Sequence, residues 1–450
     1  MDATEVASRI AGGKITALEA MKSALSNAQK NKDLGAIIEI SRSKALRLAK
    51  AADQKSPKKR GCFHGVPFLG KDLGSSPAHL IASAGVDALK NKLRLKKSNS
   101  ELFSKFENSG LLTFGLTTVP EFGLALTSEP NGQKPARNPW NYNYSSGGSS
   151  GGAATAVAAG IVSIAHATDA AGSIRIPAAC CGLMGLKPSR GTSPGGPDYG
   201  NYLAGITEEF VITRSIRDLK KAFNLLNSNI HFNNLPKKFN KKLKIGIFVP
   251  QNCSKLQRNM IKEVIDNLKS TQSEILQISS IGELGKASHE IARIILSVSL
   301  WDCLNNYEIC DSEISPLSAA IAREGKEISG TELFSEIRRM AQITYKMNMI
   351  FDKIDVLLTP VLADLPPKLG HFNFEKTDSS KHFKDMEDLA PNASLANICG
   401  YPALTMPFGF TGGFPVGFQL MSKIGTDLSL LELGEKLDQI TDKLIFPFER

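Results

Sequence analysis

Two glycine clusters that carry serine stand close together in this chain of 450 residues. The first reads Ser-Gly-Gly-Ser-Ser-Gly-Gly at 146–152, and the second reads Thr-Asp-Ala-Ala-Gly-Ser-Ile-Arg-Ile-Pro at 168–177. Residues 153–166 between them are almost all small and apolar, which predicts a short buried helix. This arrangement can hold two hydroxyls and several backbone N–H groups around one buried point, as nucleophilic attack on a carbonyl requires. We therefore interpret the chain as an amide hydrolase.

Ser149 formally lies in a Gly-x-Ser-x-Gly motif, the nucleophile elbow of α/β-hydrolases. That elbow needs a hydrophobic strand directly before it, whereas residues 137–144 are mostly polar and interrupted by proline. The sequence context therefore excludes an elbow. Taken alone, the cluster is equally typical of a flexible loop rich in glycine and serine.

Lys71 is the last matching residue of a second, partial motif: Gly65, Gly70 and Lys71 match the first positions of a phosphate-binding P-loop. Asp72 stands where that loop needs serine or threonine, and its carboxylate would repel a phosphate. Pro67 also removes one of the N–H donors that would hold the anion. We therefore expect no nucleotide site in this segment.

Ser173 follows Ala-Ala-Gly at a predicted turn, where successive N–H groups can converge as an oxyanion hole. A plain helix cap is the alternative, since serine is a favoured N-cap residue. Asp169 and Arg175 flank the turn and would make it rigid if they pair, the alternative being two separately solvated charges. The histidines show no Ser-His-Asp order. A lone histidine such as His166, at the end of the expected apolar helix, is more typical of the core than of a catalytic base.

The distribution of helical and strand patterns predicts an α/β fold in which helices surround a mixed central β-sheet. Helical periodicity dominates 2–53 and 259–350, and residues 135–146 look like a loop because of their Pro and Asn content. Short apolar runs predict the strands, at 65–70, 111–116, 243–249, 355–360, 403–406 and 416–420.

The composition is that of an ordinary globular protein, with 42% hydrophobic and 22% charged residues. A net charge of +10 raises the question of nucleic-acid binding, but much of the excess lies in lysine runs at 90–97 and 236–242. Such runs are typical of solvated surfaces or linkers, so we expect no nucleic-acid partner. No apolar run reaches the length of a membrane span, and we expect no membrane association.

The seven cysteines show no C-x-x-C spacing and no paired framework, which is typical of reduced thiols in a cytosol. The acidic, amphipathic start of the chain differs from a signal peptide, so we expect a cytoplasmic protein. No cluster of metal-ligating residues is visible, and we expect neither a metal nor an organic cofactor. The possibility of a homodimer stays open, because the sequence does not determine the oligomeric state.

Taken together, the motifs resemble those of the amidase signature family. The resemblance rests on Gly-Gly-Ser-Ser-Gly-Gly at 147–152, on Asp-x-x-Gly-Ser-Ile-Arg-Ile-Pro-Ala at 169–178, and on Cys-Gly-Leu-Met-Gly-Leu-Lys-Pro at 181–188. It covers nearly the whole chain, because further matching segments follow in the family's order, at 64–72, 120–123, 138–140, 213–218, 358–360, 400–403 and 415–420.

The resemblance implies a catalytic triad of Lys71, Ser149 and Ser173, with Ser173 as the nucleophile and a cis peptide between Gly148 and Ser149. Ser149 would relay the nucleophile's proton to Lys71, which must be neutral and therefore poorly solvated, because a free lysine has a pKa near ~10.4. The backbone N–H groups expected to form the oxyanion hole are those of Ala170, Ala171, Gly172 and Ser173. The residues expected to support the triad are Gly148, Ser150, Asp169 and Arg175.

Ala171 departs from the family's pattern, which has glycine at this position. If the backbone there must adopt a positive φ, alanine costs roughly 1 kcal/mol or distorts the oxyanion donors. Reduced activity or a changed substrate range is then one alternative, and a catalytically weakened binding protein on the same fold is another.

The surrounding motifs look more like those of free-standing acylamidases and cyclic-amide hydrolases than those of a glutaminase subunit. The alternative of the A subunit of a glutamyl-tRNA(Gln) or aspartyl-tRNA(Asn) amidotransferase stays open. In either case we expect a small amide as the substrate. Phe122, Trp140 and the helix-rich region 259–350 are the candidates for its pocket, although both aromatic residues could equally be ordinary core.

We expect one domain over 1–450. It would consist of N-terminal helices at 1–60, a core with the catalytic residues at 61–225, a helix-rich flanking layer at 226–350 and the C-terminal part of the core at 351–450.

Overall fold

An eleven-stranded mixed β-sheet runs through the computed structural model and carries the candidate residues near its middle. The structure describes residues 1–195, 202–226, 239, 242–269, 273–439 and 444–447. The strand order in the sheet is β1-β3-β2-β6-β8-β7-β12-β13-β11-β9-β10, and β4 pairs with β5 in a separate two-stranded sheet. The strands are β1 (Ile37–Ile40), β2 (Pro67–Lys71), β3 (Leu112–Thr117), β4 (Arg137–Asn138), β5 (Asn141–Ser145), β6 (Ile164–Asp169), β7 (Met184–Lys187), β8 (Glu208–Thr213), β9 (Lys244–Ile247), β10 (Glu274–Gln277), β11 (Val356–Pro360), β12 (Ala403–Thr411) and β13 (Phe414–Ser422).

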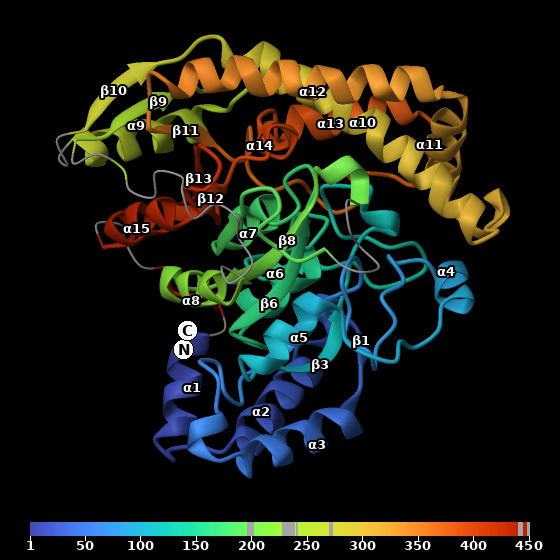
Figure 1. Cartoon of the computed structure of the whole chain (residues 1–450), viewed down its shortest axis with the longest axis vertical. Helices are drawn as coiled ribbons and strands as arrows, with labels where there is room; N and C mark the ends of the chain where they lie inside the picture. Colours follow the sequence, from blue (N-terminus) through green and yellow to red (C-terminus); the bar gives the residue numbers. More distant parts are fainter. Residues whose placement is uncertain (196–201, 227–238, 240–241, 270–272, 440–443, 448–450) are drawn as a thin grey trace.

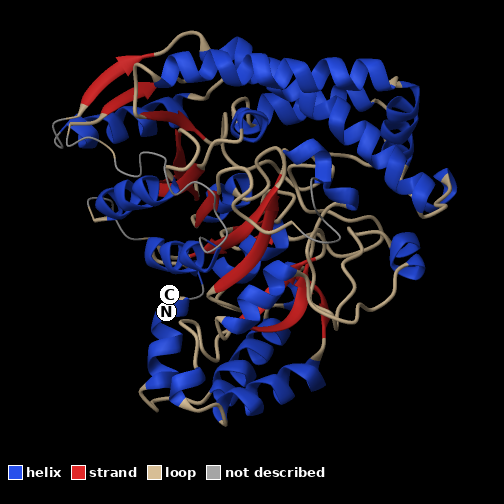
Figure 2. Ribbon diagram, in the orientation of Figure 1, coloured by secondary structure: helices blue, strands red, loops and turns tan. Residues whose placement is uncertain are grey.

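Helices lie around the sheet, as Figure 2 shows. In Figure 1, α1, α2 and α3 lie at one end of the molecule, and α10, α11 and α12 form a layer at the opposite end. The described helices are α1 (Ala3–Ala11), α2 (Ala17–Lys30), α3 (Arg42–Asp53), α4 (Asp87–Lys92), α5 (Glu101–Asn108), α6 (Gly151–Ala158), α7 (Arg175–Cys181), α8 (Ile216–Leu226), α9 (Lys255–Lys269), α10 (Ile281–Asn306), α11 (Pro316–Glu327), α12 (Gly330–Phe351), α13 (Ser379–Leu389), α14 (Ala393–Cys399) and α15 (Asp427–Asp438).

The predicted α/β class with a mixed sheet is confirmed. In the centre, β2 is parallel to both β3 and β6, whereas β8 is antiparallel to β6. All six strands expected from apolar runs are present, with bounds shifted by a few residues. A capping box begins α2, since Thr16 and Glu19 exchange hydrogen bonds of 2.8 and 3.0 Å.

Three local predictions are wrong. The apolar run 153–166 is not one helix, because α6 ends at Ala158 and β6 begins at Ile164, which places His166 inside a strand. Small apolar residues suit a buried helix and a buried strand alike, so periodicity did not separate the two. Residues expected as a loop form the β4–β5 hairpin, and β1 interrupts the N-terminal helices.

One large hydrophobic core takes residues from the N-terminal helices, the sheet and α15, and a smaller one lies between α10, α12 and α14. Every residue of α6 is buried, because this helix packs against α7 and against several strands of the central sheet, among them β6, β2 and β3. Gly152 shows how close the packing is: a Cβ built on it would lie 2.3 Å from the backbone N of Thr118 and 2.6 Å from the carbonyl O of Ala36.

We therefore expect Gly152→Ala to destabilise the protein by roughly 1–3 kcal/mol, because the backbone atoms that its Cβ meets cannot rotate away. Gly330→Ala is the matched control: it also lies at the start of a helix, and no atom lies within 4 Å of its Cβ position. That variant should be as stable as wild type or more so. Thermal unfolding followed by circular dichroism measures both midpoints. Equal midpoints for the two variants would contradict the tight packing of α6.

Candidate active site

Lys71, the last residue of β2, has no exposed surface, and its amine lies between two hydroxyls. Its Nζ donates to Ser149 Oγ at 2.8 Å and to Thr168 Oγ1 at 2.7 Å. Burial lowers the pKa of the amine to about 7, although the carboxylates of Asp169 and Glu209 act in the opposite direction. The neutral form needed for a base is therefore accessible near neutral pH.

The sheet explains why these groups meet. Because β2 and β6 are parallel, their carboxyl ends lie at the same edge, where β2 ends in Lys71 and β6 ends in Thr168 and Asp169. The loop before α6 brings Ser149 to this edge. The Gly148–Ser149 peptide is cis, as the resemblance implies. A Cβ on Gly148 would lie 2.4 Å from the carbonyl O of Thr127, so only glycine fits there.

Ser173 lies in the turn between β6 and α7, and it lines the same cavity as Ser149. The structure shows no hydrogen bond between these two described hydroxyls. The turn reverses at Gly172, whose φ is +110°. Ala171 is outside the positive-φ region, so the strain considered for alanine at this position does not arise.

The four N–H groups expected to form an oxyanion hole are not equivalent. The Gly172 N–H donates to Asp169 Oδ1 at 2.7 Å and is therefore occupied. Among the described residues, the N–H groups of Ala170, Ala171 and Ser173 meet no acceptor. Of the four expected donors, one is thus occupied and three have no acceptor among the described residues.

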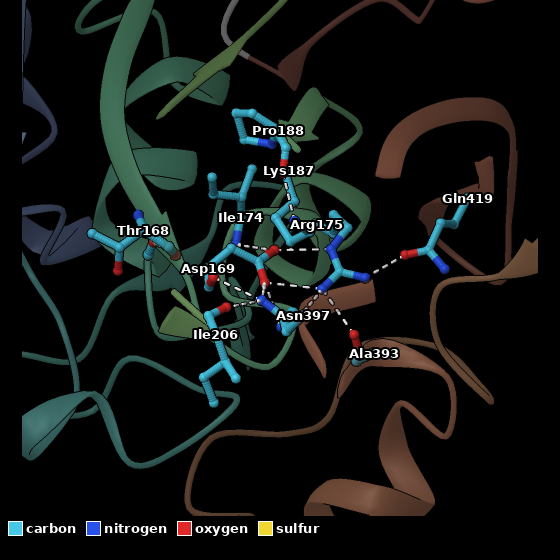
Figure 3. A network of polar contacts seen from close by, with 12 residues as sticks. Thr168, Asp169, Ile174, Arg175, Lys187, Pro188, Ile206, Ala393, Asn397 and Gln419 are labelled. Atoms are coloured by element: carbon cyan, nitrogen blue, oxygen red, sulfur yellow. Dashed lines mark hydrogen bonds and ion pairs between the residues drawn. The ribbon is translucent and has the colours of Figure 1, made fainter. Parts of the chain in front are cut away.

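Asp169 and Arg175 form the predicted pair, and they are fully buried (Figure 3). Arg175 donates from Nε and Nη2 to the two carboxylate oxygens, each at 2.9 Å. Asp169 also accepts from the N–H of Ile174 at 3.1 Å, so the carboxylate holds both sides of the turn that presents Ser173. Burial alone would raise the pKa of Asp169, but the Arg175 charge and its hydrogen bonds hold that pKa well below its usual value.

Two amide side chains from the C-terminal part of the chain complete this network, as Figure 3 shows. Asn397 of α14 accepts from Arg175 Nη2 at 2.7 Å and donates to the carbonyl O of Asp169 at 2.8 Å. Gln419 of β13 accepts from Arg175 Nη1. The turn is therefore fixed by residues more than two hundred positions away in the sequence.

The cavity in front of the hydroxyls has a volume of about 40 Å³. Phe122 lines it, and α10, which belongs to the helix-rich region, supplies one wall. Trp140 does not line it: its ring packs on Phe410 and Phe446, and its Nε1 donates to the carbonyl O of Cys181. The lining residues are Leu73, Phe122, Gly123, Leu124, Ser149, Thr168, Ala170, Ser173, Leu203, Thr207, Leu296, Ser299, Leu300 and Cys303.

Sequence reasoning missed Thr168, which is a direct partner of Lys71. Its signal was present, because it directly precedes Asp169 in the second cluster. Ser150 supports this residue from the first cluster: its Oγ accepts from the Thr168 N–H at 3.3 Å. Asn397 carried no local signal, and Gln419 lies in the matching segment 415–420 but was not singled out there.

In the described part of the chain, no three His, Cys, Asp or Glu side chains gather as metal ligands would. A search of the same residues finds no helix with the length and hydrophobicity of a membrane span.

Comparisons with known proteins agree on one family. Residues 19–431 match the Amidase family model. The 6-aminohexanoate-cyclic-dimer hydrolase of Paenarthrobacter ureafaciens is 27% identical, over 97% of this chain and 94% of that protein. A solved structure of a 6-aminohexanoate cyclic dimer hydrolase has a TM-score of 0.88, at 24% identity over 98% of this chain and 97% of its own. A bacterial aryl acylamidase of the amidase signature family has a TM-score of 0.83, at 24% identity over 100% and 99% of the two chains. The two structural likenesses show the shared fold.

The conformation of the turn before α7 predicts that substitutions at two neighbouring positions destabilise the protein to different extents. Gly172→Ala should cost roughly 2–4 kcal/mol, because alanine disfavours the positive φ and its Cβ would lie 2.6 Å from Ile176 Cδ1 and 2.9 Å from Ala393 Cβ. Ala171→Gly should cost no more than about 1 kcal/mol. Denaturant unfolding followed by circular dichroism compares the two. A larger loss for Ala171→Gly than for Gly172→Ala would contradict this description of the turn.

Proposed function

The chain belongs to the amidase family, and from this premise we propose that Ser173 attacks the carbonyl carbon of a small amide while Ser149 passes its proton to Lys71. Membership of the family agrees with the resemblance of the motifs, and the chain is an enzyme that hydrolyses amide C–N bonds. One observation carries the proposed mechanism: the buried Lys71 amine contacts Ser149 Oγ at 2.8 Å, at a cavity that Ser173 also lines.

The base works because its environment disfavours the ammonium form. When Lys71 is neutral, the 2.8 Å contact allows the Ser149 hydroxyl to donate to Nζ, while one N–H of the amine still donates to Thr168. Ser149 can then accept the proton of Ser173 as that hydroxyl attacks the substrate. Thr168 keeps the amine in place during this transfer.

The attack converts the carbonyl oxygen into an oxyanion, which the N–H groups of Ala170, Ala171 and Ser173 are free to stabilise. Asp169 has a different task, because it binds the Gly172 and Ile174 N–H groups and so fixes the shape of the turn. When the tetrahedral intermediate collapses, the C–N bond breaks, and the proton relay formed by Ser149 and Lys71 returns a proton to the leaving amine. A water molecule then attacks the acyl-Ser173 ester and gives up its proton to the same relay. The bond between the acyl carbon and Ser173 Oγ breaks, the relay returns the proton to Oγ, and the acid is released.

The cavity favours an uncharged substrate. Its described lining consists of apolar and hydroxyl-bearing side chains, one thiol and backbone, with no charged side chain. Glutamine, the substrate of the glutaminase-subunit alternative, carries an ammonium and a carboxylate that would find no charged partner here. We therefore favour a free-standing amidase acting on a linear or cyclic amide with an uncharged acyl part.

Modification by a fluorophosphonate tests the nucleophile without knowledge of the substrate. Intact mass spectrometry should show one adduct on wild type, with peptide mapping to Ser173. Ser173→Ala should show none, and Lys71→Ala should react at least about a hundredfold more slowly, since it lacks the base. Ser146→Ala is the matched control: this serine belongs to the same cluster, but its hydroxyl donates to the carbonyl O of Ala136.

Ser146→Ala should therefore react like wild type. No adduct on folded wild type would contradict an activated serine and would favour the weakened binding protein or a chain that needs a partner subunit. An adduct on a serine other than Ser173 would contradict the proposed nucleophile.

The rate of this modification should depend on pH through Lys71. Because the amine must be neutral and its pKa is about 7, the rate should rise with pH and level off above about 7. Below that value it should fall about tenfold per pH unit. A rate that keeps rising to pH 10, as for an unshifted lysine, would contradict Lys71 as the base. Circular dichroism at each pH controls for unfolding.

A further inference from the structure

Three polar side chains lie on one face of the sheet next to Lys71, and the proposed mechanism uses only one of them. His166 and Thr168 are two residues apart on β6, so their side chains point to the same face. Glu209 is the residue of β8 directly opposite Thr168 in the antiparallel ladder, which places it on this face as well. His166 and Glu209 are therefore brought to the base by strand register.

His166 connects the main chain of Lys71 to Glu209. The Lys71 N–H donates to His166 Nδ1 at 3.2 Å, and His166 Nε2 lies 2.8 Å from Glu209 Oε2. A backbone N–H can only donate, so Nδ1 must act as the acceptor and cannot carry a proton. The ring is therefore neutral, with its proton on Nε2, and it donates that proton to the glutamate.

The pair is held rigidly. His166 has no exposed surface, and its ring meets those of Phe103 and Phe106 at centroid distances of 5.1 and 6.1 Å. Glu209 is 3% exposed and also accepts from the N–H and Oγ of Ser75, at 3.0 and 2.9 Å. All of these donors are neutral groups. They satisfy the carboxylate without cancelling its charge.

On the premise of the base proposed for Lys71, we propose that His166 and Glu209 are positioning residues for it. His166 fixes the main chain from which the amine extends, and Glu209 orients the imidazole and places a negative charge beside the amine. An ordinary buried pair would contribute to stability alone. The two roles differ in one measurable property, the pH at which Lys71 loses its proton.

The charged groups that face Lys71 from the packed elements are few. Asp169 at the end of β6 and Glu209 of β8 both favour the ammonium form. Asp169 is paired with Arg175 at 2.9 Å, which offsets part of its charge. Asp72, the next residue after Lys71, directs its carboxylate to the N–H groups of Ser83 and Gly85. Glu209 is thus the carboxylate that acts on the Lys71 amine and has only neutral described partners.

The test measures the rate of fluorophosphonate modification of Ser173 against pH in the full-length protein. In Glu209→Gln the charge that favours the ammonium is gone, so Lys71 should lose its proton more easily. The rising limb, which is the part of the rate–pH curve where the rate still increases with pH, should shift to lower pH by roughly half a unit or more. Glu208→Gln is the matched control, because this neighbouring carboxylate points to the opposite face of β8, toward the N–H groups of Gly191 and Ser193.

The rising limb of the rate–pH curve of Glu208→Gln should coincide with that of wild type.

A second pair of variants tests the hydrogen bonds that His166 makes to Lys71 and Glu209. His166→Gln keeps an acceptor and a donor on one planar group, whereas His166→Leu keeps neither. On the plateau above the limb, we expect His166→Leu to react at least about tenfold more slowly than His166→Gln. This pair decides the question if circular dichroism shows that Glu209→Gln does not fold.

The outcomes separate the two proposals. If wild type forms no adduct on Ser173 at any pH, the proposed function itself fails. If wild type reacts and Glu209→Gln keeps the wild-type limb, or shifts it no more than Glu208→Gln does, the positioning role is wrong while the function stands. Equal plateau rates for His166→Gln and His166→Leu would likewise overturn the role of His166.

Discussion

The side chains of Asp169 and Arg175 meet at 2.9 Å inside the protein, where neither charge can be hydrated. Each must therefore satisfy the other, and both must fill their remaining hydrogen-bonding positions from nearby groups. Asp169 does so with the N–H groups of the turn that carries Ser173, and Arg175 with Asn397 and Gln419. One ion pair thus ties the shape of the turn to the packing of α14 and β13 against it.

The carboxylate of Asp169 also acts on Lys71, on the other side of the site. A lysine amine taken out of water loses its preference for the charged form, and Lys71 is completely buried. If nothing opposed burial, the amine would be a weak base at neutral pH. The carboxylates of Asp169 and Glu209 limit the fall of its pKa, which stays at about 7. Burial therefore has the largest effect on the pKa of Lys71, and the sheet register that fixes these two carboxylates limits that effect.

The sequence predicted those parts of the site that are local. The Asp169–Arg175 pair spans six positions of one turn, and the serines and Lys71 lie in recognisable motifs. Prediction from the sequence failed where contacting residues are far apart in the chain, or where one pattern fits two kinds of structure. The strand that carries His166 was not predicted, because its small apolar residues fit a helix equally well. Trp140 was a candidate for the pocket, but its ring packs on Phe410 and Phe446. The strand pairing that places Glu209 opposite Thr168 depends on the whole sheet, which no local pattern encodes.

The pairing of Glu209 with Thr168 matters for the site because the sheet contains both parallel and antiparallel strands. Because β2 and β6 are parallel, their ends deliver Lys71 and Thr168 to the same edge. Because β8 is antiparallel to β6, it is the start of β8 that lies at this edge, and Glu209 stands there as its second residue. With a parallel β8, the same edge would hold its last residues, Ile212 and Thr213, and no carboxylate. One reversal of strand direction therefore decides whether a second carboxylate, in addition to that of Asp169, acts on the Lys71 amine.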